Sequence, residues 1–172
     1  MSESGDGGGK LVIIIFGGLG CLVVGLALIG ILAALAIPSF VQYMQRAKAA
    51  EAIGITSTVA DQVSAEYELS CEFPPSLPPT ADVDTCCGGE LCASDPEAMA
   101  VWEEAGLFGL SHEAYFSYET EQIDSSTYEI RAEADFSCGG ANHVETIQLT
   151  AHGDPPNCRL EQAPRVTTNE FQ

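Results

Sequence analysis

The sequence predicts an α+β protein in which a long N-terminal helix, first transmembrane and then amphipathic, packs on a small antiparallel sheet. Three observations support this prediction. Residues 11–37 form an apolar run, and no charged residue occurs between Lys10 and Arg46. A stripe of apolar and small residues at helical spacing follows, and later segments alternate apolar and polar residues as strands do. Six cysteines in the same later part indicate loops cross-linked by disulfides.

Residues 1–10 are a polar, glycine-rich leader, and residues 11–38 are expected to form a transmembrane helix. At ~1.5 Å per residue the apolar run makes a helix of about 40 Å, longer than the ~30 Å hydrocarbon core of a bilayer. A secretory signal peptide has an apolar core of only ~7–15 residues. The run therefore predicts a permanent membrane anchor.

An amphipathic helix over residues 39–70 is expected to continue the anchor beyond Pro38, which removes one backbone hydrogen bond. Its apolar or small positions recur mostly three or four residues apart. They are Phe40, Met44, Ala47, Ala52, Ile55, Val59, Val63 and Tyr67. Such a stripe needs a cover, and the remaining domain is the candidate.

Residues 71–172 are expected to form one globular domain with a cysteine-rich loop and a three- or four-stranded antiparallel sheet. Four prolines exclude a helix from residues 72–80. Residues 95–106 predict a short helix that begins at a Ser94 or Asp95 cap and places Trp102, Leu107 and Phe108 toward the core. Three alternating segments, 114–120, 126–136 and 144–150, predict a meander, and the tail after Pro156 an irregular segment.

Six cysteines outside the anchor are disulfide candidates. They are Cys71, Cys86, Cys87, Cys92, Cys138 and Cys158. Six cysteines allow 15 connectivities; we expect Cys86 and Cys87 to have different partners and Cys138 to pair with Cys158. The alternative is a zinc site built from the 86, 87 and 92 cysteines with a distant cysteine or histidine, but adjacent cysteines are awkward joint ligands.

The domain is strongly acidic: from Glu51 onward 23 acidic residues face three arginines, a net charge of −20 with neutral histidines. Such a surface repels phosphate backbones, so no nucleic-acid partner is expected, whereas basic partners are possible. The usual interpretation of this charge is a solvated surface.

No catalytic constellation is evident, so we expect no enzyme and no cofactor. His112, His143 and His152 are each expected at the surface. Asp82, Asp84 and Glu90 could meet a calcium ion, but their spacing matches no EF-hand, and solvated loop acids are the simpler interpretation.

Small residues mark the anchor as a helix-packing element. Gly17, Cys21 and Gly25 lie four residues apart on one face, a spacing that lets membrane helices approach closely. A lipidated Cys21 is the minor alternative, because a long apolar stretch follows it where a lipoprotein has a polar tether.

Residues 29–52 resemble a known family. Gly30-Ile-Leu-Ala-Ala-Leu-Ala-Ile-Pro38, followed by Ser39-Phe-Val-Gln-Tyr43 and Arg46-Ala-Lys-Ala-Ala-Glu-Ala52, is similar to the N-terminal helix of type IV pilins and type II secretion pseudopilins. The resemblance implies a pilin-like fold and a filament subunit whose N-terminal helix packs on those of other subunits. Gly30, Ala34 and Pro38 then join the candidate assembly positions. It also implies an inner-membrane anchor with the domain periplasmic or extracellular.

Two family features are missing from residues 11–28. Counting back from Pro38, Cys21 occupies the position of the family's buried glutamate, and the cleavage junction falls at Phe16-Gly17 without the usual motif. Burying that carboxylate requires a partner charge, so its absence removes a contact between subunits. Two functions therefore stay open: a filament subunit processed near Gly17, and a permanently anchored binding module that does not polymerise.

The charges that flank the anchor leave its orientation balanced. Lys10 precedes it, whereas Arg46 and Lys48 follow it, and this count leans slightly toward a cytoplasmic domain. The cysteine content and the family resemblance both favour an exported domain, and we give them more weight than a difference of one charge.

Overall fold

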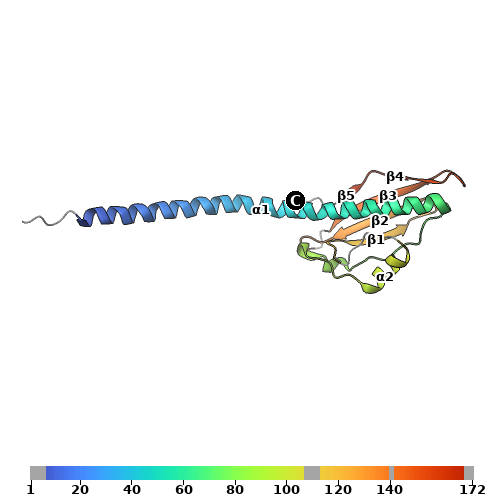
Figure 1. Cartoon of the computed structure of the whole chain (residues 1–172), viewed down its shortest axis with the longest axis horizontal. Helices are drawn as coiled ribbons and strands as arrows, with labels where there is room; N and C mark the ends of the chain where they lie inside the picture. Colours follow the sequence, from blue (N-terminus) through green and yellow to red (C-terminus); the bar gives the residue numbers. More distant parts are fainter. Residues whose placement is uncertain (1–6, 107–112, 140–141, 169–172) are drawn as a thin grey trace, which may run out of the picture. The chain divides into compact units, whose positions relative to one another are not determined.

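A computed structural model describes residues 7–106, 113–139 and 142–168, with side chains from Val23 onward (Figure 1). The chain divides into two compact units, Met1–Tyr43 and Met44–Gln172. One helix, α1 (Gly7–Ser70), contributes to both units. Its first part, up to Tyr43, lies in the first unit, and its second part lies in the globular unit.

Helix α1 begins at Gly7, four residues before the predicted start of the apolar helix, and continues through Pro38. From Val23 it is long and apolar enough to cross a membrane, with an 18-residue window of mean hydropathy 2.4. The N-terminal helix and the small antiparallel sheet of the predicted α+β class are both present.

The sheet has five strands in the described part of the chain. They are β1 (Ser117–Gln122), β2 (Thr127–Ala134), β3 (His143–His152), β4 (Arg159–Gln162) and β5 (Val166–Thr168). The order is β1-β2-β3-β4, every pairing is antiparallel, and β5 pairs with β3 beyond the end of β4. The predicted meander is therefore present, but the expectation of an irregular tail is wrong for β4 and β5.

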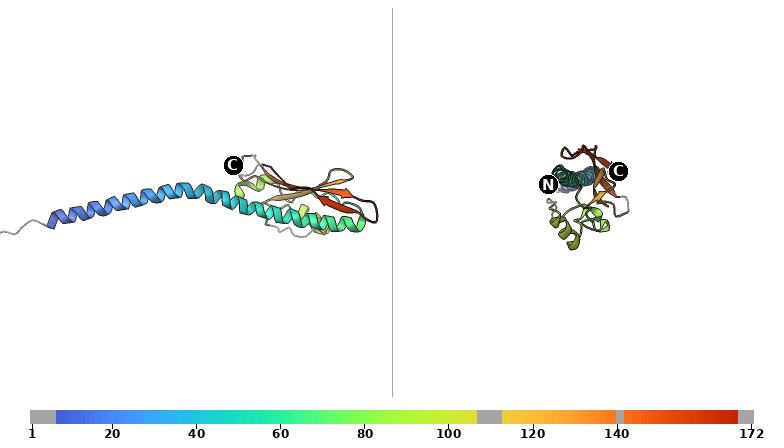
Figure 2. Two further views of the ribbon diagram at one scale, coloured as in Figure 1. Left: turned by 90° about the horizontal axis from the view of Figure 1, so that it is seen from above. Right: turned by 90° about the vertical axis from the view of Figure 1, so that its right-hand side faces the viewer.

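The core of the globular unit lies between the sheet and the second part of α1, which runs along the sheet in Figure 2. Strand β2 alternates half-buried and buried residues along its whole length, so one face points to the core. Ala52, Val59 and Val63 of the predicted stripe are buried on the helix side, whereas Ala47 is exposed. The small helix residues let α1 approach the aromatic residues of the sheet closely.

The loop between α1 and β1 closes the other edge of the sheet. Leu77 forms an antiparallel bridge with Thr120 on β1, and two 3-10 turns follow, η1 (Val83–Thr85) and η2 (Cys87–Gly89). Because this loop occupies the edge of β1, that edge is not open to another chain at Thr120.

Helix α2 (Pro96–Glu104) begins where the sequence predicts. Asp95 accepts a hydrogen bond from the backbone N–H of Glu97 at 2.9 Å, and proline occupies the first turn. Trp102 is buried and donates from Nε1 to the carbonyl oxygen of Pro78 at 2.8 Å. The expectation for Leu107 and Phe108 lies outside the described residues.

Candidate membrane-anchoring and helix-packing site

The described first part of α1 presents an apolar surface. Its large apolar side chains between Val23 and Tyr43 are 48% to 70% exposed. They are Val23, Val24, Leu26, Leu28, Ile29, Ile31, Leu32, Leu35, Ile37, Phe40, Val41 and Tyr43. Exposing that much contiguous apolar surface to water is unfavourable at ~25 cal/mol per Å², so this segment requires lipid or protein around it.

The small residues of this segment are open to a partner. A Cβ atom added at Gly25 or Gly30 would meet no atom within 4 Å, so packing within the chain does not require glycine there. Ala34 and Pro38 are exposed on the same helix. Gly17 and Cys21 lie in its helical backbone, and the surroundings of both residues are outside the described part.

All six candidate cysteines are paired, but the expected Cys138–Cys158 bond is wrong. The bonds are Cys71–Cys158, Cys86–Cys92 and Cys87–Cys138, with Cα–Cα distances of 5.5, 4.2 and 5.0 Å. Cys138 precedes β3 and Cys158 follows it, and a strand of that length spans about 33 Å, far beyond the ~7 Å limit for a disulfide. Cys86 and Cys87 do have different partners, as predicted.

The described residues contain no assembled set of metal ligands. No group of three or more histidine, cysteine or acidic residues lies together there. The three cysteines of the zinc alternative are oxidised in disulfides. Asp82, from the calcium alternative, accepts a hydrogen bond from the backbone N–H of Asp84 and so caps η1.

Two charged residues in the second part of α1 bond to other segments of the globular unit. The Lys48 ammonium donates to the carbonyl oxygen of Gly89 and lies 4.5 Å from the centre of the Tyr115 ring. Glu51 accepts from the backbone N–H of Tyr115 at 3.0 Å and from the Tyr118 hydroxyl at 3.3 Å. Burial, and then the nearby Glu51 charge and hydrogen bond, raise the pKa of Tyr118 well above its usual value.

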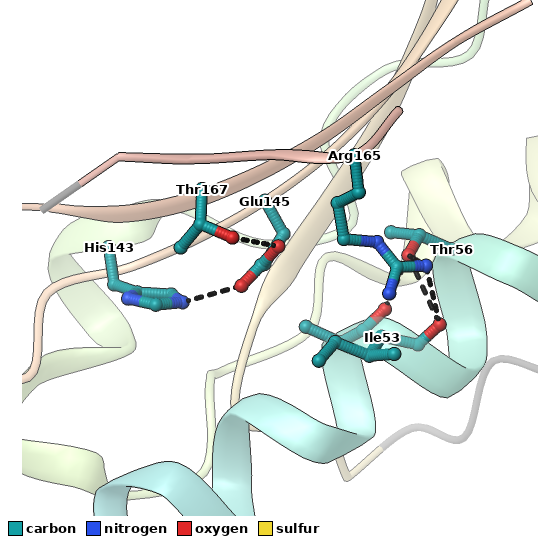
Figure 3. A network of polar contacts seen from close by, with 7 residues as sticks. Ile53, Thr56, His143, Glu145, Arg165 and Thr167 are labelled. Atoms are coloured by element: carbon teal, nitrogen blue, oxygen red, sulfur yellow. Dashed lines mark hydrogen bonds and ion pairs between the residues drawn. The ribbon is translucent and has the colours of Figure 1, made fainter. Parts of the chain in front are cut away.

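Arg165 also contacts α1, from the C-terminal segment of the chain. Its Nη2 atom donates to the carbonyl oxygen of Ile53 at 3.1 Å and to the Ser57 hydroxyl at 2.7 Å (Figure 3). It lies in the connection between β4 and β5, so it joins the C-terminal segment to α1.

A buried polar group lies beside this contact (Figure 3). The Nε2 atom of His143 is 3.1 Å from Oε1 of Glu145, and Oε2 of Glu145 accepts from the Thr167 hydroxyl at 2.8 Å. The side chains of His143 and Glu145 are only 4% and 3% exposed. The expectation of a surface His143 is therefore wrong, whereas His152 is exposed as expected, and His112 lies outside the described residues.

Sequence reasoning missed Lys48, Glu51, Glu145 and Arg165 as contact residues. The signal for Glu145 is present in the strand alternation, because it shares its face with Ile147 and Leu149, both buried. No local pattern indicates Arg165, since its partners lie more than 100 residues earlier in the chain.

A shallow depression of about 360 Å³ lies at the end of α1, lined by Tyr67, Cys71, Glu72, Phe73, Gln122 and Ser125. The Phe73 ring stacks on Tyr128, with centroids 5.4 Å apart, and lies 4.8 Å from the Tyr67 ring. The Phe73 ring thus packs against two protein rings.

Comparison with protein-family models, curated proteins and solved structures finds no match for this chain. The functional argument therefore rests on the residues and geometry described above.

Proposed function

We propose that this chain is a pilin-like or pseudopilin-like structural subunit of a type IV pilus or a type II secretion-type filament. Its N-terminal helix anchors it in the inner membrane before assembly. The same helix packs on those of other subunits in the filament. The globular domain faces the periplasm or the cell exterior, and the chain has no catalytic role.

The observation that supports this proposal most strongly is the exposed apolar surface of α1 between Val23 and Tyr43. A soluble monomer rarely leaves so much apolar surface uncovered. Lipid covers such a surface before assembly, and the helices of neighbouring subunits cover it afterwards. Gly25, Gly30 and Ala34 allow those helices a close approach.

The family-like segment also has a role in the globular unit. Lys48 and Glu51, within the Arg46–Ala52 part of the motif, bond to the loop at Gly89 and to β1 at Tyr118. These contacts account for charged residues at those two positions independently of the resemblance.

An outward-facing domain agrees with the disulfides, which persist in oxidising compartments.

A second function is favoured by one specific observation: the apolar run has no acidic residue and no usual cleavage motif at Phe16-Gly17. The chain would then be a permanently anchored extracytoplasmic binding module that does not polymerise. The two functions share the anchor and differ in the mature N-terminus.

Mass spectrometry of the purified mature protein distinguishes them. A methylated N-terminus near Gly17–Cys21 supports the filament subunit, whereas an intact Met1 supports the permanent anchor. Deletion of the gene is the second test. Loss of filaments, motility or secretion is expected, and unchanged assembly, motility and secretion would contradict the subunit function.

The anchor itself is tested with a matched pair of charge substitutions. Leu32→Arg places a charge in the apolar segment, costs about 3 kcal/mol of insertion, and is expected to move protein from the membrane to the soluble fraction. Val101→Arg, at an exposed apolar position on α2, is expected to leave the distribution unchanged. Release of the natural chain itself from the membrane fraction by carbonate extraction would contradict the proposed anchor.

A further inference from the structure

The three disulfides differ in how far solvent reaches them. Cys138 is the exposed one of the six bonded cysteines, and its partner Cys87 is half-buried. The Cys86–Cys92 bond is buried at both ends, and the Cys71–Cys158 bond has one half-buried and one buried end. A thiolate opens a disulfide by attacking one of its sulfurs, so the rate depends on access to that sulfur. Access therefore favours the opening of Cys87–Cys138 over that of the other two bonds.

The described neighbours of Cys138 leave its sulfur accessible. The residue follows β2 and lies between Ser137 and Gly139, which are both exposed. On the side of the loop, a Cβ atom added at the exposed Gly88 would lie 3.4 Å from Sγ of Cys138. Because glycine carries no side chain, Gly88 does not cover the sulfur.

The Cys71–Cys158 bond provides a comparison within the same chain. Cys138 has a φ of 53° and Cys71 a φ of 58°, so each bond includes one residue in the left-handed region. The two bonds share this backbone conformation and differ in the exposure of their cysteines. A difference in their rates of reduction therefore reports access rather than backbone conformation.

The Cys87–Cys138 bond joins the cysteine-rich loop to the end of β2, across a sequence separation of 51. Two hydrogen bonds act beside it. The backbone N–H of Gly88 donates to the carbonyl oxygen of Asp135 at 3.0 Å, and Lys48 on α1 donates to the carbonyl oxygen of Gly89. Single hydrogen bonds hold a surface loop far less firmly than a covalent bond does, so opening of the disulfide favours local opening of residues 87–91.

We propose that Cys138 is a surface redox site, at which the thiolate of a dithiol reductant opens Cys87–Cys138 and releases residues 87–91 from the end of β2. The Cys71–Cys158 and Cys86–Cys92 bonds stay closed and keep the rest of the globular unit folded. This inference is independent of whether the chain polymerises.

The reaction is a two-step thiol–disulfide exchange. The first thiolate of the reductant bonds to Sγ of Cys138, the protein disulfide breaks, and its electron pair goes to Sγ of Cys87, which takes up a proton. The second thiolate of the reductant then attacks the reductant sulfur bound to Cys138 and expels Cys138 as a thiolate, which is protonated in turn. The reductant closes its own disulfide and loses two electrons, and the protein bond gains them.

Timed reduction of the full chain in detergent tests the order of opening. Dithiothreitol is added without denaturant at about pH 8, samples are quenched with iodoacetamide, and mass spectrometry of peptides identifies the alkylated cysteines. We expect Cys87 and Cys138 to be alkylated at least about tenfold faster than the other four cysteines. Simultaneous alkylation of all six would overturn the proposal, since it reports global unfolding, and so would earlier opening of Cys71–Cys158.

A monothiol identifies the sulfur that is attacked. Free L-cysteine has no second thiol with which to resolve the mixed disulfide, so it remains on the sulfur that it attacked, and iodoacetamide alkylates the sulfur that left. We expect the added cysteine on Cys138 and the alkyl group on Cys87. The reverse distribution would refute Cys138 as the site.

Hydrogen exchange, resolved to peptides, measures the release of the loop. After selective opening of Cys87–Cys138, exchange in residues 87–91 is expected to rise at least about threefold, while β2 stays protected. Unchanged exchange in residues 87–91 would contradict the release, and a parallel rise in β2 would contradict its confinement to the loop.

Two double variants provide matched controls. C87S/C138S removes the bond in advance, so exchange in residues 87–91 is expected to be the same with and without dithiothreitol. C71S/C158S keeps the bond and is expected to retain the response of residues 87–91. A response that persists in C87S/C138S, or that disappears in C71S/C158S, would assign the effect to another disulfide. Selective reduction of the natural chain requires no substitution, so it decides the question if either variant fails to fold.

Discussion

The Lys48 ammonium donates a hydrogen bond to the carbonyl oxygen of Gly89, and a side chain at residue 89 would require this ammonium to move. A Cβ atom added there would lie 2.7 Å from Nζ of Lys48. Gly89 also has φ +75°, in the left-handed region that favours glycine. The contact between Lys48 on α1 and the loop at residue 89 therefore depends on glycine at that position.

Gly89→Ala is expected to destabilise the protein by about 1–2 kcal/mol, because it strains the backbone and displaces the Lys48 ammonium. Chemical denaturation of the full chain in detergent, followed by Trp102 fluorescence, measures the change. Gly54→Ala is the matched control: Gly54 is exposed in α1 with no atom within 4 Å of an added Cβ. It should be stabilising by about 0.5–1 kcal/mol. A loss of stability equal to that of Gly89→Ala would contradict the interpretation.

Removing Cys71–Cys158 by a double serine substitution is expected to cost more stability than removing Cys86–Cys92. The first bond closes a sequence separation of 87 and the second one of 6. Chain-entropy arguments assign about 4–5 kcal/mol to the long loop and about 2 kcal/mol to the short one. Urea unfolding of the two double variants measures this difference. The reverse ranking would mean that packing strain, not loop closure, dominates.

Arg165→Lys is expected to destabilise the protein by about 1–2 kcal/mol, although it conserves charge. Both bonds come from the Nη2 atom of Arg165, and a lysine side chain is one bond shorter, so its ammonium does not reach the position from which Nη2 contacts Ile53 and Ser57. Thermal unfolding measures the change. The control, Arg159→Lys at an exposed position, should stay within about 0.5 kcal/mol of the natural chain. Equal values for the two would show that the α1 contact adds no stability.

Tyr118→Phe is expected to flatten the loss of stability at alkaline pH. The pKa of Tyr118 is raised in the folded protein, first by burial and then by Glu51, from its usual value of 10.0. Above that value the unfolded chain loses the proton while the folded chain keeps it, so stability falls by about 1.4 kcal/mol per pH unit for this group. Denaturation at a series of pH values measures the slope. Tyr128, whose pKa burial also raises, provides a second variant with the same expected sign.

The sequence was informative wherever one segment determines its own structure. The membrane-length helix follows from uninterrupted apolar residues, α2 from its Asp95 cap and first-turn proline, and the meander from alternation in β1, β2 and β3. The expectation failed for β4 and β5. The tail after Pro156 is expected to be irregular, yet the edge of β3 that faces away from β2 pairs with two short segments of this tail.

Some features of the candidate site could likewise be predicted from the sequence, and others could not. The apolar surface of the anchor and the oxidation of six cysteines could be predicted, because composition and length determine them. The pairing of those cysteines could not be predicted, because it depends on which cysteines the folded sheet brings to the same end of β3.

By itself, the sequence determined a membrane-length helix, an α+β domain and a set of disulfide-forming cysteines, all consequences of local composition and periodicity. Only the tertiary structure decided that Cys138 pairs with Cys87, that His143 and Glu145 are buried together, and that Arg165 bonds to α1. These contacts join residues whose neighbours in space are distant in the chain or are set by which face a strand turns inward. Such relationships arise when the sheet packs on the helix, and the strand alternation indicates only that His143 and Glu145 share one face of β3.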